Sequence, residues 1–406
     1  MYTYIDLFAG CSGLSDGFEQ VGQYHGLAHV EWESIAARTL ANRLETRWKI
    51  KDANKKVLRF DIQRTDELIN GWYDPEFGES NGLKSCLGKL KKIDVLIGGP
   101  PCQAYSIAGR VRDGNGMHND YRNYLFESYV KVMNWAKPDV FIFENVLGIL
   151  SAAPGGIPIV DRIHKAFSDA GYVTLNNFKD AVFNLDDFGV PQKRSRVIIV
   201  GLRKNAFKGC GDVQEILKSF YKDFKEDKVV KKTSAEMALK GLTKFYPSKS
   251  SEIKSKLSHS PEKSKFLNHI PRFHNRRDIE TFRLLSDDLI SGRGKYASAD
   301  AIKSLYTERT GKTSAIHKYH VIRPDQPSNT IPAHLYKDGL RHIHWDPEQC
   351  RSITVREAAR LQGFDDDFEF LGGMGDQYKM IGNAVPPLFA LKLGRRLVNL
   401  LKIRLT

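Results

Sequence analysis

The chain has 406 residues, a formal net charge of +14 and 41% hydrophobic residues. This is the composition of a folded globular protein with room for about two or three domains. No apolar run reaches the roughly 18 residues of a membrane span, and the chain does not open with a basic and then an apolar segment, so we expect no membrane anchor and a cytoplasmic location. Five scattered cysteines without a CxxC pair argue against a disulfide framework and against a structural zinc site, and we expect no metal.

The positive charge is concentrated in one part of the chain. Residues 204–320 contain 25 Lys and Arg against 14 Asp and Glu, which gives +11 of the total +14. Such a block indicates a polyanionic partner, but a solvated insert would have the same charge, and charge alone leaves both interpretations open.

Strand and helix patterns alternate through the first 203 residues. The expected strands are 4–8, 26–30, 94–97, 140–143 and 197–200, and the expected helices are 14–21, 35–44, 123–136 and 160–170. Strands that are apolar on both faces and separated by amphipathic helices predict an α/β fold with a doubly wound, mostly parallel sheet.

The pattern changes after Arg203, where strand signals fade and Lys, Ser and Thr dominate up to about Lys265. Ordered structure is expected again from Ile331 and more clearly from Thr354. Thr354 begins a capped helix that ends at Gly363. The segment from Pro387 onward predicts a basic amphipathic helix that packs on the first domain. We therefore expect one domain from residues 1–203 and 375–406, and a second, smaller, basic domain from residues 204–374.

Three features near strand ends favour a nucleoside cofactor. The first expected strand continues into Ala9-Gly10-Cys11-Ser12-Gly13-Leu14 and then a helix, a place where bare backbone and free N–H groups meet a ligand. Glu31 ends the second strand about twenty residues further on. This spacing is typical of a carboxylate that binds the ribose hydroxyls of a nucleoside. Asp61 follows a third strand end. The full GxGxxG pattern is missing, which counts against NAD or FAD.

Two reactive side chains also follow expected strands. Cys102 lies in Gly98-Gly99-Pro100-Pro101-Cys102-Gln103, and Glu144 ends the strand at 140–143. Alone, the cysteine would be an inert core residue and the glutamate a helix cap. Together, at the carboxyl edge of one sheet, they suit attack on an electron-poor ring with acid assistance.

Six motifs occur in the order found in the DNA cytosine-5 methyltransferases, which the chain resembles. They cover nearly all of the chain outside residues 204–320, and together they are far more specific than any one of them. They are Asp6-Leu7-Phe8-Ala9-Gly10, Gly99-Pro100-Pro101-Cys102-Gln103, Glu144-Asn145-Val146, Gln192-Lys193-Arg194-Ser195-Arg196, the segment 351–362 and Gly382-Asn383-Ala384-Val385-Pro386-Pro387.

The resemblance implies a Rossmann-like, S-adenosylmethionine-dependent methyltransferase domain. Carried over by motif, the cofactor contacts are Phe8, Ala9, Gly10, Gly13, Leu14, Glu31, Trp32, Asp61, Ile62, Pro100, Leu125, Asn383 and Ala384. Ser12 stands where a glycine is common, and Asp365 stands where a proline is common.

The same resemblance implies the chemistry. Cys102 as a thiolate would add to C6 of cytosine, with Arg194 and Arg196 as candidates for nearby positive charge. Glu144 would hold the ring N3 and exocyclic amine, and Asn145 would brace the loop. The base that removes the C5 proton is not identifiable. The cytosine must leave the duplex for any of this to happen.

The basic domain is then a DNA target-recognition domain that contacts phosphates and base edges of double-stranded DNA. Its candidate contacts are Arg272, His274, Arg276, Arg277, Arg293, Lys295 and Thr330. We expect a monomer of prokaryotic or viral type, with a separate restriction endonuclease as the partner such enzymes often have. A tRNA cytosine-5 methyltransferase and a catalytically silent DNA-binding protein are the alternatives.

Overall fold

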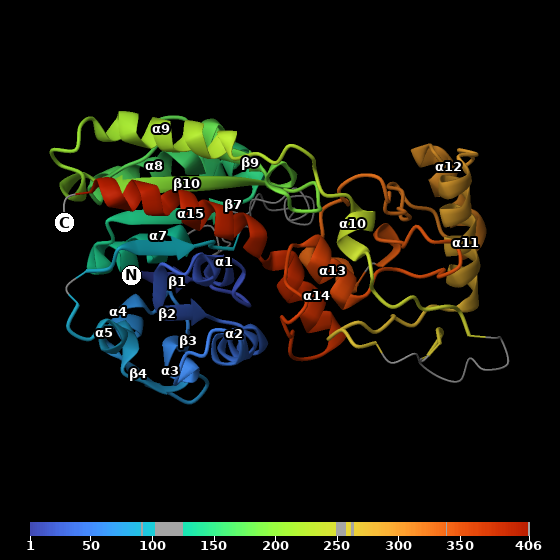
Figure 1. The fold of residues 1–406 in the computed structure, drawn as a ribbon, viewed down its shortest axis with the longest axis horizontal. Coiled ribbons are helices and arrows are strands. Elements are labelled where there is room, and N and C mark those ends of the chain that lie inside the picture. Colours follow the sequence, from blue (N-terminus) through green and yellow to red (C-terminus); the bar gives the residue numbers. More distant parts are fainter. Residues whose placement is uncertain (91, 102–124, 249–256, 261–263, 338, 405–406) are drawn as a thin grey trace. The chain divides into compact units, whose positions relative to one another are not determined.

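The computed structural model describes residues 1–90, 92–101, 125–248, 257–260, 264–337 and 339–404. Its contacts divide the chain into two compact units (Figure 1). The first unit contains residues 1–188, 194–230 and 384–406, and the second contains residues 189–193 and 231–383. The first unit thus extends to Val230, past the boundary expected at Arg203, and residues 375–383 lie in the second unit.

The first unit is an α/β fold. Its strands are β1 Tyr2–Leu7, β2 Tyr24–Glu31, β3 Val57–Arg59, β4 Trp72–Asp74, β5 Gly78–Ser80, β6 Val95–Gly98, β7 Val140–Asn145, β8 Tyr172–Val173, β9 Val182–Asn184 and β10 Ser195–Arg203. Its α-helices are α1 Gly13–Val21, α2 Ser34–Thr46, α3 Ala53–Lys56, α4 Thr65–Asn70, α5 Gly82–Leu87, α7 Leu125–Ala136, α8 Ile159–Asp169, α9 Val213–Glu226 and α15 Pro387–Ile403.

The main sheet has the order β3-β2-β1-β6-β7-β10-β8, with β9 paired to β10. β3, β2, β1, β6 and β7 are mutually parallel, whereas β10 runs antiparallel to β7. The chain proceeds from β1 outward to β3 and later returns with β6 on the other side of β1. The β1–β6 pair is therefore the topological switch point, where doubly wound sheets bind their ligands.

The last helix completes the first unit, as its amphipathic pattern predicts. α15 packs on α1 (Figure 1). The approach is close enough to require glycine, because a Cβ on Gly17 would lie 2.5 Å from Cβ of Ala390. The end of the chain is also held: Arg404 forms ion pairs with Asp94 at 2.5 Å and with the fully buried Asp139 at 2.7 Å.

The second unit contains few regular elements. Its α-helices are α10 Ala235–Leu239, α11 Arg276–Ser291, α12 Ala299–Thr310, α13 Val355–Leu361 and α14 Met374–Asn383. Phe282, Leu285, Leu305, Tyr319 and Ile343 form a hydrophobic cluster that includes α11 and α12. α13 begins with the predicted cap, a capping box between Thr354 and Glu357. In the described residues, no helix of either unit has the length and apolarity that crossing a membrane requires.

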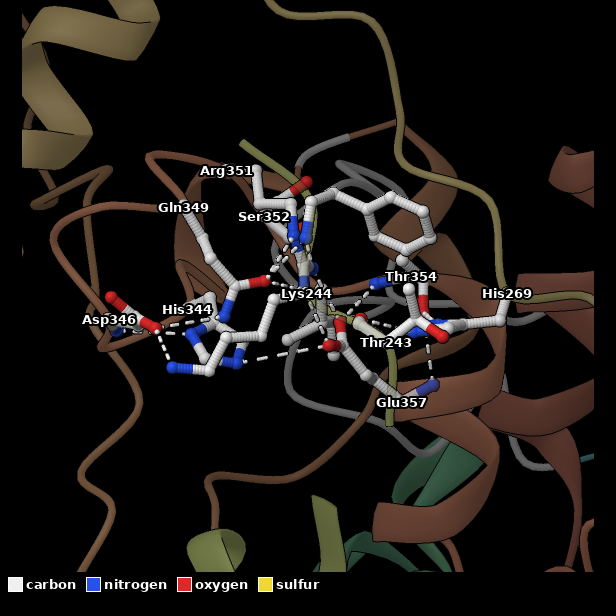
Figure 2. A network of polar contacts seen from close by, with 12 residues as sticks. Thr243, Lys244, His269, His344, Asp346, Gln349, Arg351, Ser352, Thr354 and Glu357 are labelled. Carbon is white, nitrogen blue, oxygen red and sulfur yellow. Dashed lines mark hydrogen bonds and ion pairs between the residues drawn. The ribbon is translucent and has the colours of Figure 1, made fainter. Parts of the chain in front are cut away.

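A buried polar network organises the loops of this unit (Figure 2). Arg351 is fully buried and forms a bidentate ion pair with Glu357, with both N–O distances at 2.7 Å. Gln349 Oε1 accepts further hydrogen bonds from the same guanidinium. Burial raises the pKa of Glu357, but the charge and hydrogen bonds of Arg351 outweigh burial and leave that pKa below its usual range.

Buried histidines surround this ion pair. His269 Nδ1 lies 2.8 Å from Thr354 Oγ1 and its Nε2 lies 2.9 Å from the Thr243 carbonyl oxygen. His344 Nδ1 accepts a hydrogen bond from the Asp346 amide, and its Nε2 lies 3.8 Å from Glu357. Burial and then the charge of Arg351 lower the pKa of His344 to about 4. Burial likewise lowers the pKa of His259 and His320 to about 4, and of His274 and His342 to about 3.

These neutral histidines predict that the second unit loses stability in mild acid. Their folded-state pKa values lie below 6.5, so the unfolded chain binds protons first as the pH falls below that value. The contribution of each neutral histidine to the free energy of unfolding is complete above pH 6.5. It falls by about 1.4 kcal/mol per pH unit as the pH decreases toward 4. The check is the free energy of unfolding by urea, measured from pH 7.5 to 5. His344→Gln should reduce this slope, because the glutamine oxygen can still accept from Asp346 but does not titrate.

The control is His164→Gln, a change at a partly exposed histidine on α8 of the first unit. It should leave the slope as it is in the original protein. An unchanged slope in the His344 variant would mean that this ring does not contribute to acid sensitivity.

Candidate active site

The loop after β1 adopts an unusual backbone at the switch point. Phe8, Gly10 and Ser12 all have positive φ angles, of 58°, 56° and 95°. Two of these three residues carry side chains that disfavour this region, and such strain is concentrated where a backbone must meet a ligand. A Cβ on Gly10 would meet no atom within 4 Å, so open space lies beside this part of the backbone.

Glu31 ties the ends of β1 and β2 together. Its Oε2 accepts a hydrogen bond from the Gly10 amide and its Oε1 accepts one from the Glu33 amide, both at 2.7 Å. The side chain is nearly buried, and burial raises the pKa of its carboxyl despite these bonds. A carboxylate accepts about four hydrogen bonds. Glu31 therefore keeps acceptor capacity for a ribose hydroxyl, which fits a nucleoside cofactor.

Several other predicted cofactor residues have structural roles near the start of α1. Ala9 and Leu14 are buried, and the Ala9 amide donates to the Val30 carbonyl at 2.9 Å. A Cβ on Gly13 would lie 2.3 Å from the Val385 carbonyl oxygen and 3.0 Å from Cβ of Ala384. The structure thus explains Gly13 by a close approach to residues 384–385. Asn383 is exposed and belongs to the second unit, and Ala384 begins the last segment of the first.

The remaining predicted cofactor residues lie after later strands. Trp32 is 46% exposed and meets Phe77 edge-on, with ring centroids 6.1 Å apart. Asp61 Oδ1 accepts from the Gln63 amide at 2.9 Å. Ile62, Pro100 and Leu125 are buried.

Glu144 lies where β6 and β7 end side by side. The two strands pair in parallel through Gly98 and Phe143, so the next residues, Gly99 and Glu144, also lie together. A Cβ on Gly99 would be 2.7 Å from Glu144 Oε2. Glu144 Oε1 forms an ion pair with Arg196 Nε at 2.8 Å, and both side chains are about seven-eighths buried. The sequence alone did not assign this close approach to Gly99. The signal that could have indicated it is a glycine directly before two prolines.

The neighbouring predicted catalytic residues brace this arrangement. Asn145 Nδ2 donates a hydrogen bond to the Pro100 carbonyl at 3.4 Å, and Arg194 donates from its terminal nitrogen to the Ala384 carbonyl at 3.2 Å. Arg194 is 3% exposed, so it supports the fold, whereas Arg196 faces the acid. Cys102 lies outside the described residues. Its predecessors Pro100 and Pro101 continue from the backbone that Glu144 contacts.

The predicted DNA contacts have different surroundings within the second unit. Arg272 donates to the carbonyls of Leu335 and Tyr336, and the ring of His274 is buried against Ser352. Both therefore have internal structural roles. The other candidates are more exposed: Arg276, Arg277, Arg293, Lys295 and Thr330.

A strained loop after β1, a ribose-compatible carboxylate on β2 and a held acid on β7 lie at the carboxyl edge of one sheet, which fits an enzyme that uses a nucleoside-type cofactor. The comparisons with known proteins identify the reaction. Residues 2–399 match the family model described as C-5 cytosine-specific DNA methylase. The chain belongs to this family.

Relatives resemble the chain over nearly its whole length. It is 31% identical to the type II methyltransferase M.Bpa9945I of Bacillus paralicheniformis, over 95% of this chain and 96% of that one. It is 30% identical to the type II methyltransferase M1.HphI of Haemophilus parahaemolyticus, over 96% and 84%. The fold resembles a prophage-encoded DNA modification methyltransferase of E. coli, with a TM-score of 0.65, 23% identity and coverage of 99% and 100%. It also resembles the S. pombe Dnmt2 methyltransferase, with a TM-score of 0.56, 13% identity and coverage of 99% and 98%.

The enzyme is a DNA cytosine-5 methyltransferase, and S-adenosylmethionine is its methyl donor. The predicted family, fold class, reaction and donor are confirmed, and the alternatives of a tRNA enzyme and a silent DNA-binding protein are set aside. The residues around Glu31 and Gly10 fit the nucleoside portion of this donor.

The geometry predicts that Glu31→Gln weakens binding of the methyl donor. The amide keeps the size of the side chain but loses the charge and turns a donor toward one of the two backbone amides. We expect the Kd for S-adenosylmethionine to rise about 10- to 100-fold, as for the loss of hydrogen bonds to a charged group. Isothermal titration calorimetry measures it, with Glu33→Gln, an exposed neighbouring carboxylate, as the control. Equal affinity in both variants would contradict the ribose assignment.

Proposed function

We propose that Cys102 and Glu144 carry out methyl transfer through a covalent Cys102–cytosine intermediate. The observation that supports this most is the position of Glu144, which rests against Gly99, three residues before the cysteine, and pairs with Arg196. An acid and a nucleophile that leave neighbouring parallel strands can reach the same ring.

The proposed reaction begins with a cytosine swung out of the duplex. An electron pair of the Cys102 thiolate forms the Sγ–C6 bond, and the electron pair of C5=C6 becomes available at C5. Glu144 holds N3 and the exocyclic amine, donates a proton to N3 as negative charge develops there, and takes that proton back when C5=C6 is restored. Asn145 keeps the Pro100 backbone in place.

S-adenosylmethionine supplies an electrophilic methyl group when bound. After C5 has taken the methyl group, a base removes the C5 proton. The electron pair of that C–H bond restores C5=C6, the Sγ–C6 bond breaks, and the thiolate of Cys102 is regenerated. Within this scheme Arg196 fixes Glu144 and keeps a positive charge beside the reacting ring.

Covalent trapping tests this mechanism. A 5-fluorocytosine cannot lose a C5 proton, so DNA amplified with the fluorinated nucleotide should become covalently attached to the enzyme when S-adenosylmethionine is present. Cys102→Ala should give no denaturant-resistant complex and a methylation rate lower by more than about 10³-fold, while DNA binding persists. Cys210→Ala, at a partly exposed cysteine, should behave like the original protein. A fully active Cys102→Ala variant would rule out this nucleophile.

We also propose that the second unit, residues 189–193 and 231–383, reads the DNA target. Exposed cations on and after α11 support this, and they are Arg276, Arg277, Arg293 and Lys295. The first two lie in the opening turn of α11, with Arg276 79% exposed.

Salt dependence measures these contacts. Replacing Arg276 and Arg277 together with alanine should weaken DNA binding and reduce the slope of log K against log salt by about 1 to 2. The control is Lys165→Ala, at a lysine 75% exposed on α8 of the first unit, which should leave the slope unchanged. An unaltered slope in the double variant would place the phosphate contacts elsewhere.

The names of the relatives support a biological setting. Both are type II methyltransferases of bacteria, so we propose that this enzyme is the modification partner of a separate restriction endonuclease. It would act as a monomer in the cytoplasm of a prokaryote. Sequencing methylated DNA from cells that express it would give the recognition sequence.

A further inference from the structure

The chain passes from the second unit to the first immediately before Arg194 and Arg196. Gly189–Lys193 belongs to the second unit, and Arg194 begins a segment of the first. Only Arg194 and Ser195 separate this crossing from Arg196, the ion-pair partner of Glu144.

Gln192 fixes the second-unit side of this crossing. Its side chain is fully buried. The amide nitrogen donates to the Leu361 carbonyl at 3.1 Å and also contacts Gln362 Oε1, while its oxygen accepts from the Ile331 amide at 2.9 Å. Both ends of the amide are thus bonded, which holds the residue against 361–362 on one side and 331 on the other.

A short backbone ladder reinforces the same segment. Gln192 and Ser328 form a parallel bridge. The Lys193 amide donates to the Ser328 carbonyl at 2.8 Å, and the Ser328 amide donates to the Pro191 carbonyl at 3.0 Å. Thr330 Oγ1 donates to the Lys193 carbonyl at 2.5 Å. The carbonyl that Thr330 holds belongs to the last residue before the crossing.

The segment 328–333 also contacts the other end of the second unit. A Cβ on Gly382 would lie 2.3 Å from the Ala333 amide nitrogen, so the two backbones touch. The chain returns to the first unit one residue later, between Asn383 and Ala384. Within the first unit, Arg194 bonds to the Ala384 carbonyl at 3.2 Å and so joins the two crossings.

We propose that Gln192 is a positioning residue for methyl transfer, which sets the register of Arg194 and Arg196 and so couples the segment 328–333 to Glu144. This inference rests on the proposed roles of Glu144 and Arg196. Its physical basis is the sensitivity of the Glu144–Arg196 pair. A displacement of about 1 Å in a reacting arrangement can lower the rate about 100-fold.

The test separates positioning from binding. Gln192→Leu keeps the volume of the side chain and removes all of its hydrogen bonds. With DNA and S-adenosylmethionine both saturating, we expect its single-turnover methylation rate to fall about 10- to 100-fold, with the Kd for the same DNA changed less than about threefold. The matched control is Gln377→Leu, because Gln377 also donates two bonds to second-unit carbonyls, those of Phe370 and Gly372, and neither partner belongs to 189–193 or 328–333. Its rate and Kd should both stay within about threefold of the original protein.

A second pair of variants decides the matter if Gln192→Leu does not fold. Thr330 is exposed, so Thr330→Val should fold, and it lacks only the hydroxyl that holds Lys193. Its rate at saturating DNA should fall, whereas Thr330→Ser, which keeps the hydroxyl, should restore it. An unchanged rate in Gln192→Leu or in Thr330→Val would overturn the proposal, as would an equal loss in the Gln377 control.

Covalent trapping keeps this inference distinct from the proposed mechanism. The Gln192 variant should attach to 5-fluorocytosine DNA more slowly but to the same final extent as the original protein. Absence of trapping in the original protein would remove the Cys102 mechanism. Normal trapping speed in the Gln192 variant would remove the positioning role alone.

Discussion

The candidate active site depends on one close contact, between the Glu144 carboxylate and the bare backbone of Gly99. Parallel pairing of β6 and β7 brings these residues together, and any side chain at 99 would occupy the place of the carboxylate oxygen. The antiparallel strand β10 then brings Arg196 to the other oxygen. Glu144 thus contacts residues of the two strands next to its own, Gly99 after β6 and Arg196 on β10. Gly99 also begins the segment that leads to Cys102.

Much of this arrangement is predictable from the sequence, because strand ends carry its chemistry. The strands at 4–8, 26–30, 94–97 and 140–143 match β1, β2, β6 and β7 within a few residues, which places Glu31 and Glu144 at one edge of the sheet. The direction of β10 is not predictable in this way, since an apolar run looks the same in either direction. The Thr354 cap was predictable because its partner Glu357 stands three residues later.

The region after Arg203 was harder to interpret because its charge hides its periodicity. α9 buries Leu217, Phe220, Tyr221 and Phe224, which recur at helical spacing among lysines and acids. This helix extends the first unit beyond the expected boundary. Charged residues hide the apolar periodicity of α11 in the same way, and its buried side carries Ile279, Phe282 and Leu285.

The basic composition of the second unit also has an internal use. In its described part, which contains isolated bridges but no named strand, arginines satisfy many loop carbonyls. Arg356 donates to the carbonyls of Leu267, Asp365 and Phe368, and Arg360 donates to those of Ala238 and Lys240. Net charge therefore overstates how many cations are available to DNA. Arg272 is an example: the basic composition suggests it as a DNA contact, but its guanidinium donates to two loop carbonyls.

A framework of buried charge is a costly way to fix loops, since an ion pair such as Arg351–Glu357 loses its hydration and often adds little net stability. Its advantage is directional: each guanidinium presents several donors in one plane and so fixes several chain segments at defined spacing. That suits the proposed role of this unit in reading DNA, because ordering side chains in advance lowers the entropy lost on binding. The neutral histidines packed around the pair extend the same framework. Loop geometry in this unit is therefore held by hydrogen bonds that acid can disrupt.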